Sequence, residues 1–534
     1  MVFTLHRYIF RETFRVFVLA TVALTLILSL GSVLRPVAEY GVGPRQVFHL
    51  MGYFLPITLT FILPMAALFA TTLVYGRFAG DNELDACRAS GISLLTLVYP
   101  GLALAVMVTT ANLILSFHVV PVFVHRAEKS IKNDAKQILF RNLQRRGYYS
   151  LPPDDRYRVY ADLAEPQNDR LSGVVIAEVK DYEIKKIITA ESAKVHFDPH
   201  DRFSEIQVTA YNTYQTGPES DEGFFAAWLV VRQRFGSLLG DNIKFKKINE
   251  MKKIRLDLMR FYPIEELARQ TYAQFTAELL AQNITGKIDA DSNSFYELIG
   301  EPNSVRFTAK SCTATDEKKV ELSGEITAIE FDTVTKKPLR TLNSTKAALY
   351  IEGDELAPIL TMELYNAIWW RPDGSQGLDR RPVIRGLILP KAVTDKFIKD
   401  DVLKTTSPAW TAEVLQEKPS AKLKTLQNKL WRKIRNTLAE IKAETHSRLV
   451  FGIGCLPLIM IGIGLGIILK GGHLLSAFGV SSIPAAVLIV FIMMGKNITK
   501  NPDAQVRFGI ELMWASIVLL SLLTLIIYRR LLKN

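Results

Sequence analysis

The stretch YGRFAGDNELDACRASGIS, residues 75–93, is a short polar segment between two long apolar runs. The run before it, residues 47–74, and the run after it, residues 92–124, contain no Lys, Arg, Asp or Glu. Because a membrane-spanning helix needs about 20 mostly apolar residues, both runs are long enough to span. The polar segment between them is therefore predicted to lie at a membrane surface.

The order of residues within this segment predicts a short helix across the membrane face, at about residues 75–91. Gly76 and Gly80 allow the chain to turn out of the membrane. The acidic residues that follow favour a helix start, and Gly91 can end the helix before the next span. A helix held by a span at each end is well placed to pass force between a soluble partner and the spans.

Further apolar runs complete the predicted membrane part. They lie at residues 16–34, 449–469, 474–494 and 508–528. Together with the two runs around the polar segment they give six spans, three at each end of the chain. Loops are predicted at residues 35–45 and 496–507, where Pro, Gly and charged residues gather.

Basic residues orient these spans, since cytoplasmic loops carry an excess of Lys and Arg. Arg35 and Arg45 lie in the loop between the first two spans. The region after about His125 then falls on the side opposite the N-terminus. The larger basic group, which places the N-terminus and the polar segment in the cytoplasm, comprises Arg7, Arg11, Arg15, Arg77 and Arg88.

Residues 125–447 are polar, and their pattern predicts antiparallel β-sheet. Apolar and polar residues alternate, with many Val, Ile, Thr and Tyr, in two sets of strand-like runs at residues 157–211 and 304–368. Between them, at about residues 254–282, the pattern is helical. The two sets form either one sheet interrupted by a helical insert or two similar β units.

A basic helix is predicted at residues 418–447, directly before the fourth span. Its basic face is interpreted either as a solvated surface or as a contact with anionic lipid head groups. A basic stretch beside a span also favours the cytoplasm, against the orientation above, although long translocated domains largely escape that rule. The apolar residues that repeat at helical spacing are Leu423, Leu426, Leu430, Ile434, Leu438 and Ile441.

No motif for catalysis is present, and no catalytic residue, cofactor or metal ligand is predicted. The sequence has no G-x-x-x-x-G-K-[ST] phosphate loop, no H-E-x-x-H metal motif and no G-x-S-x-G elbow. Glu511, the main charged residue within a span, is interpreted as an interfacial carboxylate rather than part of a proton relay. The net charge of +12 over 534 residues is scattered, which does not favour nucleic-acid binding. Three dispersed cysteines cannot form a disulfide framework.

The polar segment resembles a known family at Gly76, Arg77, Asp81, Glu83, Ala89, Ser90, Gly91 and Ser93. On these residues the chain resembles the permeases of bacterial lipopolysaccharide export, the LptF/LptG (YjgP/YjgQ) family. The segment ETHSR, residues 444–448, is also similar to the family, which often has a Glu and an Arg there. Three spans, a large external domain and three more spans agree with the same family layout.

This resemblance implies a polytopic α-helical membrane protein with six transmembrane helices, 3+3, and a large central antiparallel β, jellyroll-like, periplasmic domain carrying an α/β insertion. The membrane halves are expected at residues 1–126, which include the coupling helix, and at residues 448–534. The periplasmic domain is expected at residues 127–447. Ordinary members are shorter, with one jellyroll, so the extra length is expected within about residues 226–380.

The resemblance further implies a permease subunit of an ABC-type exporter in the bacterial inner membrane. Such a subunit extracts lipopolysaccharide or a related lipid and passes it to a periplasmic bridge protein (LptC/LptA-like). A second permease subunit, identical or different, and a cytoplasmic ABC ATPase (LptB-like) are the other implied partners. ATP hydrolysis is expected in the ATPase chain, so the permease itself is not an enzyme.

Site residues follow from the same resemblance. In the family, the Glu that matches Glu83 belongs to a coupling helix that docks in a groove of the ATPase, where a carboxylate could pair with an Arg. Arg35 and Arg45 lie where cationic groups would contact the lipid substrate. The other residues expected to couple to the ATPase are Arg77, Asp81, Asn82, Arg88, Ser90 and Gly91.

Two alternatives stay open from the sequence. One is a lipoprotein-releasing or other extrusion permease, which shares a large external domain but normally has four spans. The other is a membrane-anchored scaffold whose external domain binds a cell-envelope partner without transport. A scaffold needs no coupling helix, so indifference to replacement of Glu83 would favour it.

Overall fold

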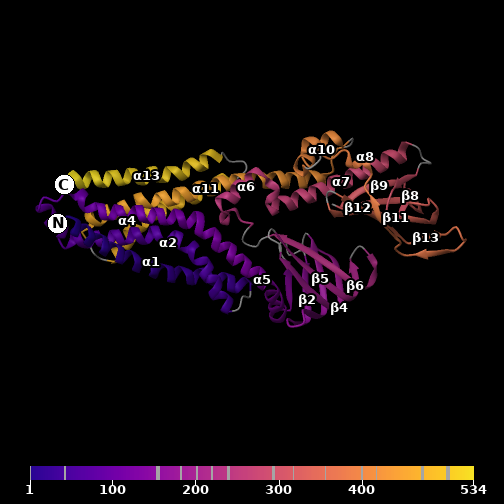
Figure 1. The fold of residues 1–534 in the computed structure, drawn as a ribbon, viewed down its shortest axis with the longest axis horizontal. Coiled ribbons are helices and arrows are strands. Elements are labelled where there is room, and N and C mark those ends of the chain that lie inside the picture. The colour runs from indigo at the N-terminus through magenta and orange to yellow at the C-terminus, as the bar shows by residue number, and fades with distance from the viewer. Residues whose placement is uncertain are drawn as a thin grey trace. The chain divides into compact units, whose positions relative to one another are not determined.

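The chain divides into two compact units, and Figure 1 shows their helices and strands. The first unit comprises Met1–Asp257 with Asn436–Asn534, and the second comprises Leu258–Arg435. The computed structural model describes residues 2–40, 44–151, 157–180, 183–199, 203–217, 220–236, 241–290, 295–316, 318–354, 357–398, 401–415, 418–470, 474–500 and 506–533.

The predicted apolar runs fall in long helices. They are α1 (Val2–Tyr40), α2 (Pro44–Gly80), α4 (Leu94–Ile114), α11 (Ala421–Leu469), α12 (Leu474–Lys500) and α13 (Val506–Lys533). The predicted first span falls in α1, whose side chains beyond Leu28 lie outside the described residues. Within the described part of the chain, five helical stretches are long and apolar enough to cross a membrane: Gly52–Gly80, Leu94–Ser130, Ala421–Leu469, Ser482–Lys500 and Val506–Lys533.

Small residues let two of these helices pack closely. Ala66 and Ala70 of α2 are fully buried in a core shared with Ile459 of α11. A Cβ atom added to Gly466 of α11 would lie 2.6 Å from the carbonyl oxygen of Thr72 in α2. Because real Cβ atoms do not approach so closely, glycine sets the separation of α2 and α11 here.

The two loops predicted between spans are shorter in the structure. The first was expected at residues 35–45, but α1 continues to Tyr40 and α2 begins at Pro44. The second was expected at residues 496–507, but α12 continues to Lys500. Lys and Arg are good helix formers, so charge ends an apolar run without ending the helix.

The third span continues out of the apolar region and meets a β-sheet. A π-helix, η1 (Leu115–Val119), joins α4 to α5 (Val120–Arg146), which ends at Gly147 with a φ of 75°. Leu139, Phe140 and Leu143 of α5 are buried against one face of the sheet. Its strands are β1 (Tyr148–Leu151), β2 (Tyr157–Glu165), β3 (Arg170–Lys180), β4 (Glu183–Pro199), β5 (Phe203–Gly217) and β6 (Ser220–Gly236).

These six strands form an antiparallel meander in sequence order. The 157–211 pattern is thereby confirmed as strands, with Val159, Ile188 and Val208 turned to the buried face. β6 lies at one end of this order and pairs with β5. After it come η2 (Ile243–Phe245) and α6 (Ile248–Leu256).

The second unit holds a separate nine-stranded sheet. Its long helix α7 (Tyr262–Ala290), preceded by η3 (Leu258–Arg260), buries Phe275, Leu280 and Ile284 against the sheet. The short helices α8 (Lys391–Thr394), α9 (Val402–Thr405) and α10 (Pro408–Val414) follow the strands. The strands are β7 (Tyr296–Leu298), β8 (Asn303–Thr308), β9 (Ser311–Asp316), β10 (Lys319–Asp332), β11 (Pro338–Asp354), β12 (Ala357–Tyr365), β13 (Ala367–Trp370), β14 (Gln376–Asp379) and β15 (Val383–Ile388).

The two strand-rich regions are therefore two sheets rather than one interrupted sheet. Their connections differ, because the first sheet is a simple meander and the second pairs strands out of sequence order, as in β8 with β10 and β12 with β15. The predicted basic helix and the fourth span are one helix, α11. Along it, Leu423, Leu430 and Ile441 are buried, as the helical spacing predicts.

Candidate functional site

The predicted short helix is α3 (Glu83–Ala89), between α2 and α4. It is shorter than residues 75–91, because α2 stays helical through Gly80. The chain turns only at Asn82, whose φ of 59° is left-handed. Gly91, with a φ of 81°, follows α3, and the side chain of Ser93 caps the first turn of α4. The turn thus falls after Gly76 and Gly80 rather than at them.

One side chain anchors α3 to the membrane helices. Leu84 is 4% exposed and lies in the apolar core with Phe78 of α2 and Leu97 of α4. The neighbouring Glu83 and Asp85 are exposed. Burial of one apolar side chain therefore fixes α3 to two spans while its acidic side chains stay at the surface.

One ion pair connects the surface of α3 to the end of α11, and two others lie within α3 and beside it. Asp85 Oδ2 lies 3.1 Å from Nζ of Lys470, directly after α11, and Oδ1 lies 3.9 Å from Arg88 Nη1. Beside α3, Arg77 Nη2 of α2 lies 3.5 Å from an oxygen of Glu12 in α1, so this pair joins α2 to α1. Such exposed pairs each contribute less than about 1 kcal/mol, so the Asp85–Lys470 pair orients α3 more than it holds it.

The remaining predicted coupling residues surround α3. Asp81 and Asn82 are exposed in the turn, and the Ser90 hydroxyl donates to the Ala86 carbonyl at 3.0 Å. Among the described residues, Glu83 takes part in none of the hydrogen bonds or ion pairs that the structure shows. Its carboxylate is therefore available to a partner.

Arg35 and Arg45, the predicted substrate contacts, lie in α1 and α2 respectively. Their side chains fall outside the described residues. A role in substrate contact stays a prediction for both.

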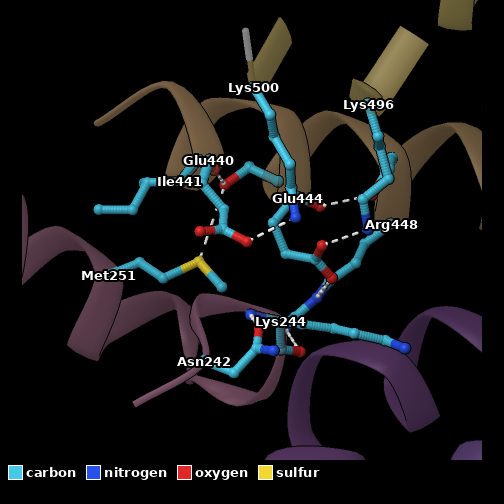
Figure 2. Close-up of polar contacts among 11 residues, drawn as sticks. Asn242, Lys244, Met251, Glu440, Ile441, Glu444, Arg448, Lys496 and Lys500 are labelled. Atoms are coloured by element: carbon cyan, nitrogen blue, oxygen red, sulfur yellow. Dashed lines mark hydrogen bonds and ion pairs between the residues drawn. The ribbon is translucent and has the colours of Figure 1, made fainter. Parts of the chain in front are cut away.

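A second polar site lies where α11 meets α12 (Figure 2). Glu444 and Arg448 are one turn apart on α11, and their side chains are 6% and 5% exposed. Arg448 Nε donates to Glu444 Oε1 at 3.2 Å, and Lys496 Nζ of α12 donates to Oε2 at 2.5 Å. Both oxygens of the buried carboxylate face cations, which offsets the cost of removing its charge from water. One turn before Glu444 on α11, Glu440 Oε1 lies 2.6 Å from Lys500 Nζ of α12.

Arg448 also holds the segment that follows the first sheet. Its Nη2 donates to the main-chain oxygen of Lys244 in η2 at 2.7 Å, and Figure 2 shows this contact beside Asn242. Asn242 Oδ1 accepts a hydrogen bond from Lys244 N at 3.0 Å, which fixes η2 from within. Burial, reinforced by the charge of Lys496, holds the pKa of Lys244 below its usual range.

A cavity of about 100 Å³ is lined by Lys244, Glu444, Arg448 and Lys496 together with apolar and hydroxyl side chains. Its wall is contributed by α2, η1, α5, η2, α11 and α12. Lys244, Arg448 and Lys496 supply three cations against one carboxylate, Glu444. The cavity is several times larger than the space that one water molecule requires.

The cavity and α3 lie at opposite ends of the same helices. From Phe61, at the cavity, to Gly80 the helix α2 rises about 29 Å at about 1.5 Å per residue. From Glu444 to Lys470, which pairs with Asp85 of α3, the rise is about 39 Å. Since a hydrocarbon core is about 30 Å thick, the two polar sites fit its two faces.

Only part of the charged cluster is visible in the sequence. The segment ETHSR stands out through its family resemblance, and its Glu and Arg are spaced by four residues, as on one helix face. Lys496 is predicted in a loop, and nothing in the sequence points to Lys244. Within the described residues, no group of three or more His, Cys, Asp or Glu could hold a metal ion.

A model of a known protein family matches the parts of the chain that contain both polar sites. A family model described as lipopolysaccharide export system permease LptF/LptG matches residues 7–279 and 321–530, which include α3 and the charged cluster. The intervening residues 280–320 contain the end of α7 and β7–β9 of the second unit. The comparison with curated proteins finds no match to the chain. Because the family model matches most of its length, the chain belongs to the LptF/LptG family of lipopolysaccharide export permeases.

Proposed function

We propose that this chain is a permease subunit of an ABC-type exporter in the bacterial inner membrane. It extracts lipopolysaccharide or a related lipid, which it passes to a periplasmic bridge, and a separate cytoplasmic ATPase supplies the energy. The single observation that carries this proposal is α3: a short polar helix fixed between two spans, with the Glu83 carboxylate exposed and unpaired among the described residues. Family membership supports the export role.

In this proposal six helices span the membrane, three from residues 1–126 and three from residues 448–534. Residues 127–447 form the periplasmic part, with jellyroll-like β structure and an insertion. Among the described strands, the end strand β6 pairs with β5 alone, and its other edge is offered to a bridge protein, since an exposed sheet edge can accept a strand from another chain. A second permease subunit completes the cavity for the lipid.

Force from the ATPase would enter through α3. An arginine of the ATPase pairs with Glu83, and closure of the ATPase pair displaces α3. Leu84 transmits the displacement to α2 and α4, and the Asp85–Lys470 pair transmits it to the end of α11. The spans that surround the lipid then close and expel it.

Co-purification of the full chain with ABC ATPases encoded in its own genome tests this proposal. The wild type is compared with Glu83→Ala and Glu83→Arg. Glu511→Ala is the matched control, because it removes another exposed carboxylate, near the start of α13. We expect an ATPase to bind the wild type and the control, and to be lost or uncoupled in both Glu83 variants. Binding that ignores Glu83 would favour a membrane-anchored scaffold instead.

A further inference from the structure

The cavity beside Arg448 has more positive charge than its own residues neutralise. Three cationic side chains line it and one carboxylate, Glu444, faces them. The Glu444 oxygens are taken up by Arg448 and Lys496. The ammonium of Lys244 forms no ion pair shown among the described residues, and it lies 5.6 Å from the ring centre of Phe245. An excess of two positive charges therefore remains around the cavity.

One buried donor at this place has no partner. Arg448 is 6% exposed, its Nε donates to Glu444 and its Nη2 donates to the Lys244 carbonyl. Its Nη1 is buried without a hydrogen-bond partner in the described part of the chain, although the guanidinium lies 5.9 Å from the ring centre of Phe117. A buried charged donor without a hydrogen-bond partner destabilises the fold, so a ligand that accepts this hydrogen bond would be stabilising.

The rest of the lining selects the kind of ligand. Ser116 lines the cavity together with the cations, and a hydroxyl donor beside cations suits a multi-oxygen anion. Thr60 also lines the cavity, but its hydroxyl donates to the Ile57 carbonyl at 2.6 Å. Phe61 and Phe451 form an apolar wall, with ring centres 5.4 Å apart, and Phe61 is 42% exposed. An exposed aromatic side chain beside a cationic cavity offers an apolar surface to an acyl chain whose head group enters the cavity.

We propose that this cavity binds a phosphate group, with Arg448 Nη1 and Lys244 Nζ as its principal donors. The phosphate belongs to the head group of an anionic membrane lipid or to a free phosphate ion. The site is lined by residues of one chain, so it needs neither a second permease subunit nor the ATPase. It goes beyond the proposed export, because a lipid held here stabilises the junction of α11, α12 and η2 whether or not it is transported.

The electrostatics of Lys244 agree with this assignment. Burial and neighbouring cations lower its pKa, so its charged form is destabilised while the cavity holds no anion. A bound phosphate supplies the missing counter-charge and raises that pKa again. Binding of the anion and protonation of Lys244 are therefore mutually favourable.

Binding to the purified full chain in a non-ionic detergent tests the proposal. The probes are short-chain phosphatidic acid, inorganic phosphate and, as an uncharged lipid, diacylglycerol of the same chain length, measured by calorimetry and native mass spectrometry. The variants are Lys244→Gln and Arg448→Lys, which removes the Nη1 donor but keeps the charge. Lys252→Gln is the matched control, because it removes one charge from an exposed position on α6.

We expect phosphate-containing probes to bind the wild type and Lys252→Gln equally, and to bind Lys244→Gln about tenfold or more weakly, since a charge-assisted hydrogen bond is lost. Arg448→Lys should weaken binding in the same direction while leaving diacylglycerol unaffected. Tighter binding of phosphatidic acid than of inorganic phosphate identifies a lipid head group as the ligand. Equal affinity for both identifies free phosphate. No binding to the wild type, or equal loss in Lys244→Gln and Lys252→Gln, would overturn the proposal.

Discussion

Replacement of Glu444 by Gln removes one negative charge from a place where two cations face it. The Arg448 side chain is 5% exposed and the Lys496 side chain 21% exposed, so water compensates neither fully once the carboxylate is gone. Removing one partner of a buried pair costs roughly 3–5 kcal/mol. We expect Glu444→Gln to lower the free energy of unfolding by about 3 kcal/mol, at the low end of this range, because the amide oxygen still accepts one hydrogen bond. This is roughly a hundredfold change in the folded-to-unfolded ratio.

Equilibrium unfolding of the purified chain in mixed detergent micelles, followed by circular dichroism, measures this effect. Glu440→Gln is the matched control, because Glu440 pairs with Lys500 one turn away but the two side chains are 26% and 42% exposed. Solvent screening limits the loss of stability in Glu440→Gln to less than about 1 kcal/mol. Lys496→Met should cost much less in the Glu444→Gln background than in the wild type. Equal destabilisation by Glu444→Gln and Glu440→Gln would refute the reasoning.

Two further predictions concern other parts of the first unit. Gly466→Ala should destabilise the packing of α2 on α11, because the added Cβ would lie too close to Thr72. Gly479→Ala on α12 is the control, because no atom lies near its Cβ position, and it should be neutral or stabilising. Thermal unfolding of both variants in detergent measures the difference. Burial raises the pKa of Glu250, but the hydrogen bond from His125 and other contacts outweigh it and lower the pKa below 4.5. The stability that Glu250 contributes is therefore present above pH 4.5 and lost as the pH falls through the lowered pKa, so the difference in stability from Glu250→Gln should shrink in acid.

The two sheets show what the alternation of apolar and polar residues predicts and what it does not. Alternation of apolar and polar residues locates strands in both regions, because each strand has one buried face whatever its partners. Pairing joins strands that can lie far apart in the sequence, such as β12 with β15, and alternation within one strand does not specify its partner. The choice between one interrupted sheet and two sheets therefore needed the tertiary structure.

For the polar segment, local chemistry was sufficient to place a helix but not its ends. Gly76 and Gly80 can turn the chain, yet both stay helical because α2 packs along α11 at this level, where Gly466 faces Gly76 N. The turn falls instead at Asn82, since Asn tolerates the left-handed conformation better than most residues. Propensity permits a turn at several positions, and helix packing selects one.

Patterns in the sequence were enough to predict the apolar helices, the strand-rich middle and a short helix in the polar segment. Each of these follows from residues close together in the chain, since hydropathy and periodicity are local properties. Only the tertiary structure joined Glu444 and Arg448 to Lys496 and Lys244. Those contacts depend on the register of α11 against α12 and on the path of the chain after the first sheet. No local pattern encodes either, because burial of a charge is decided by what packs around it.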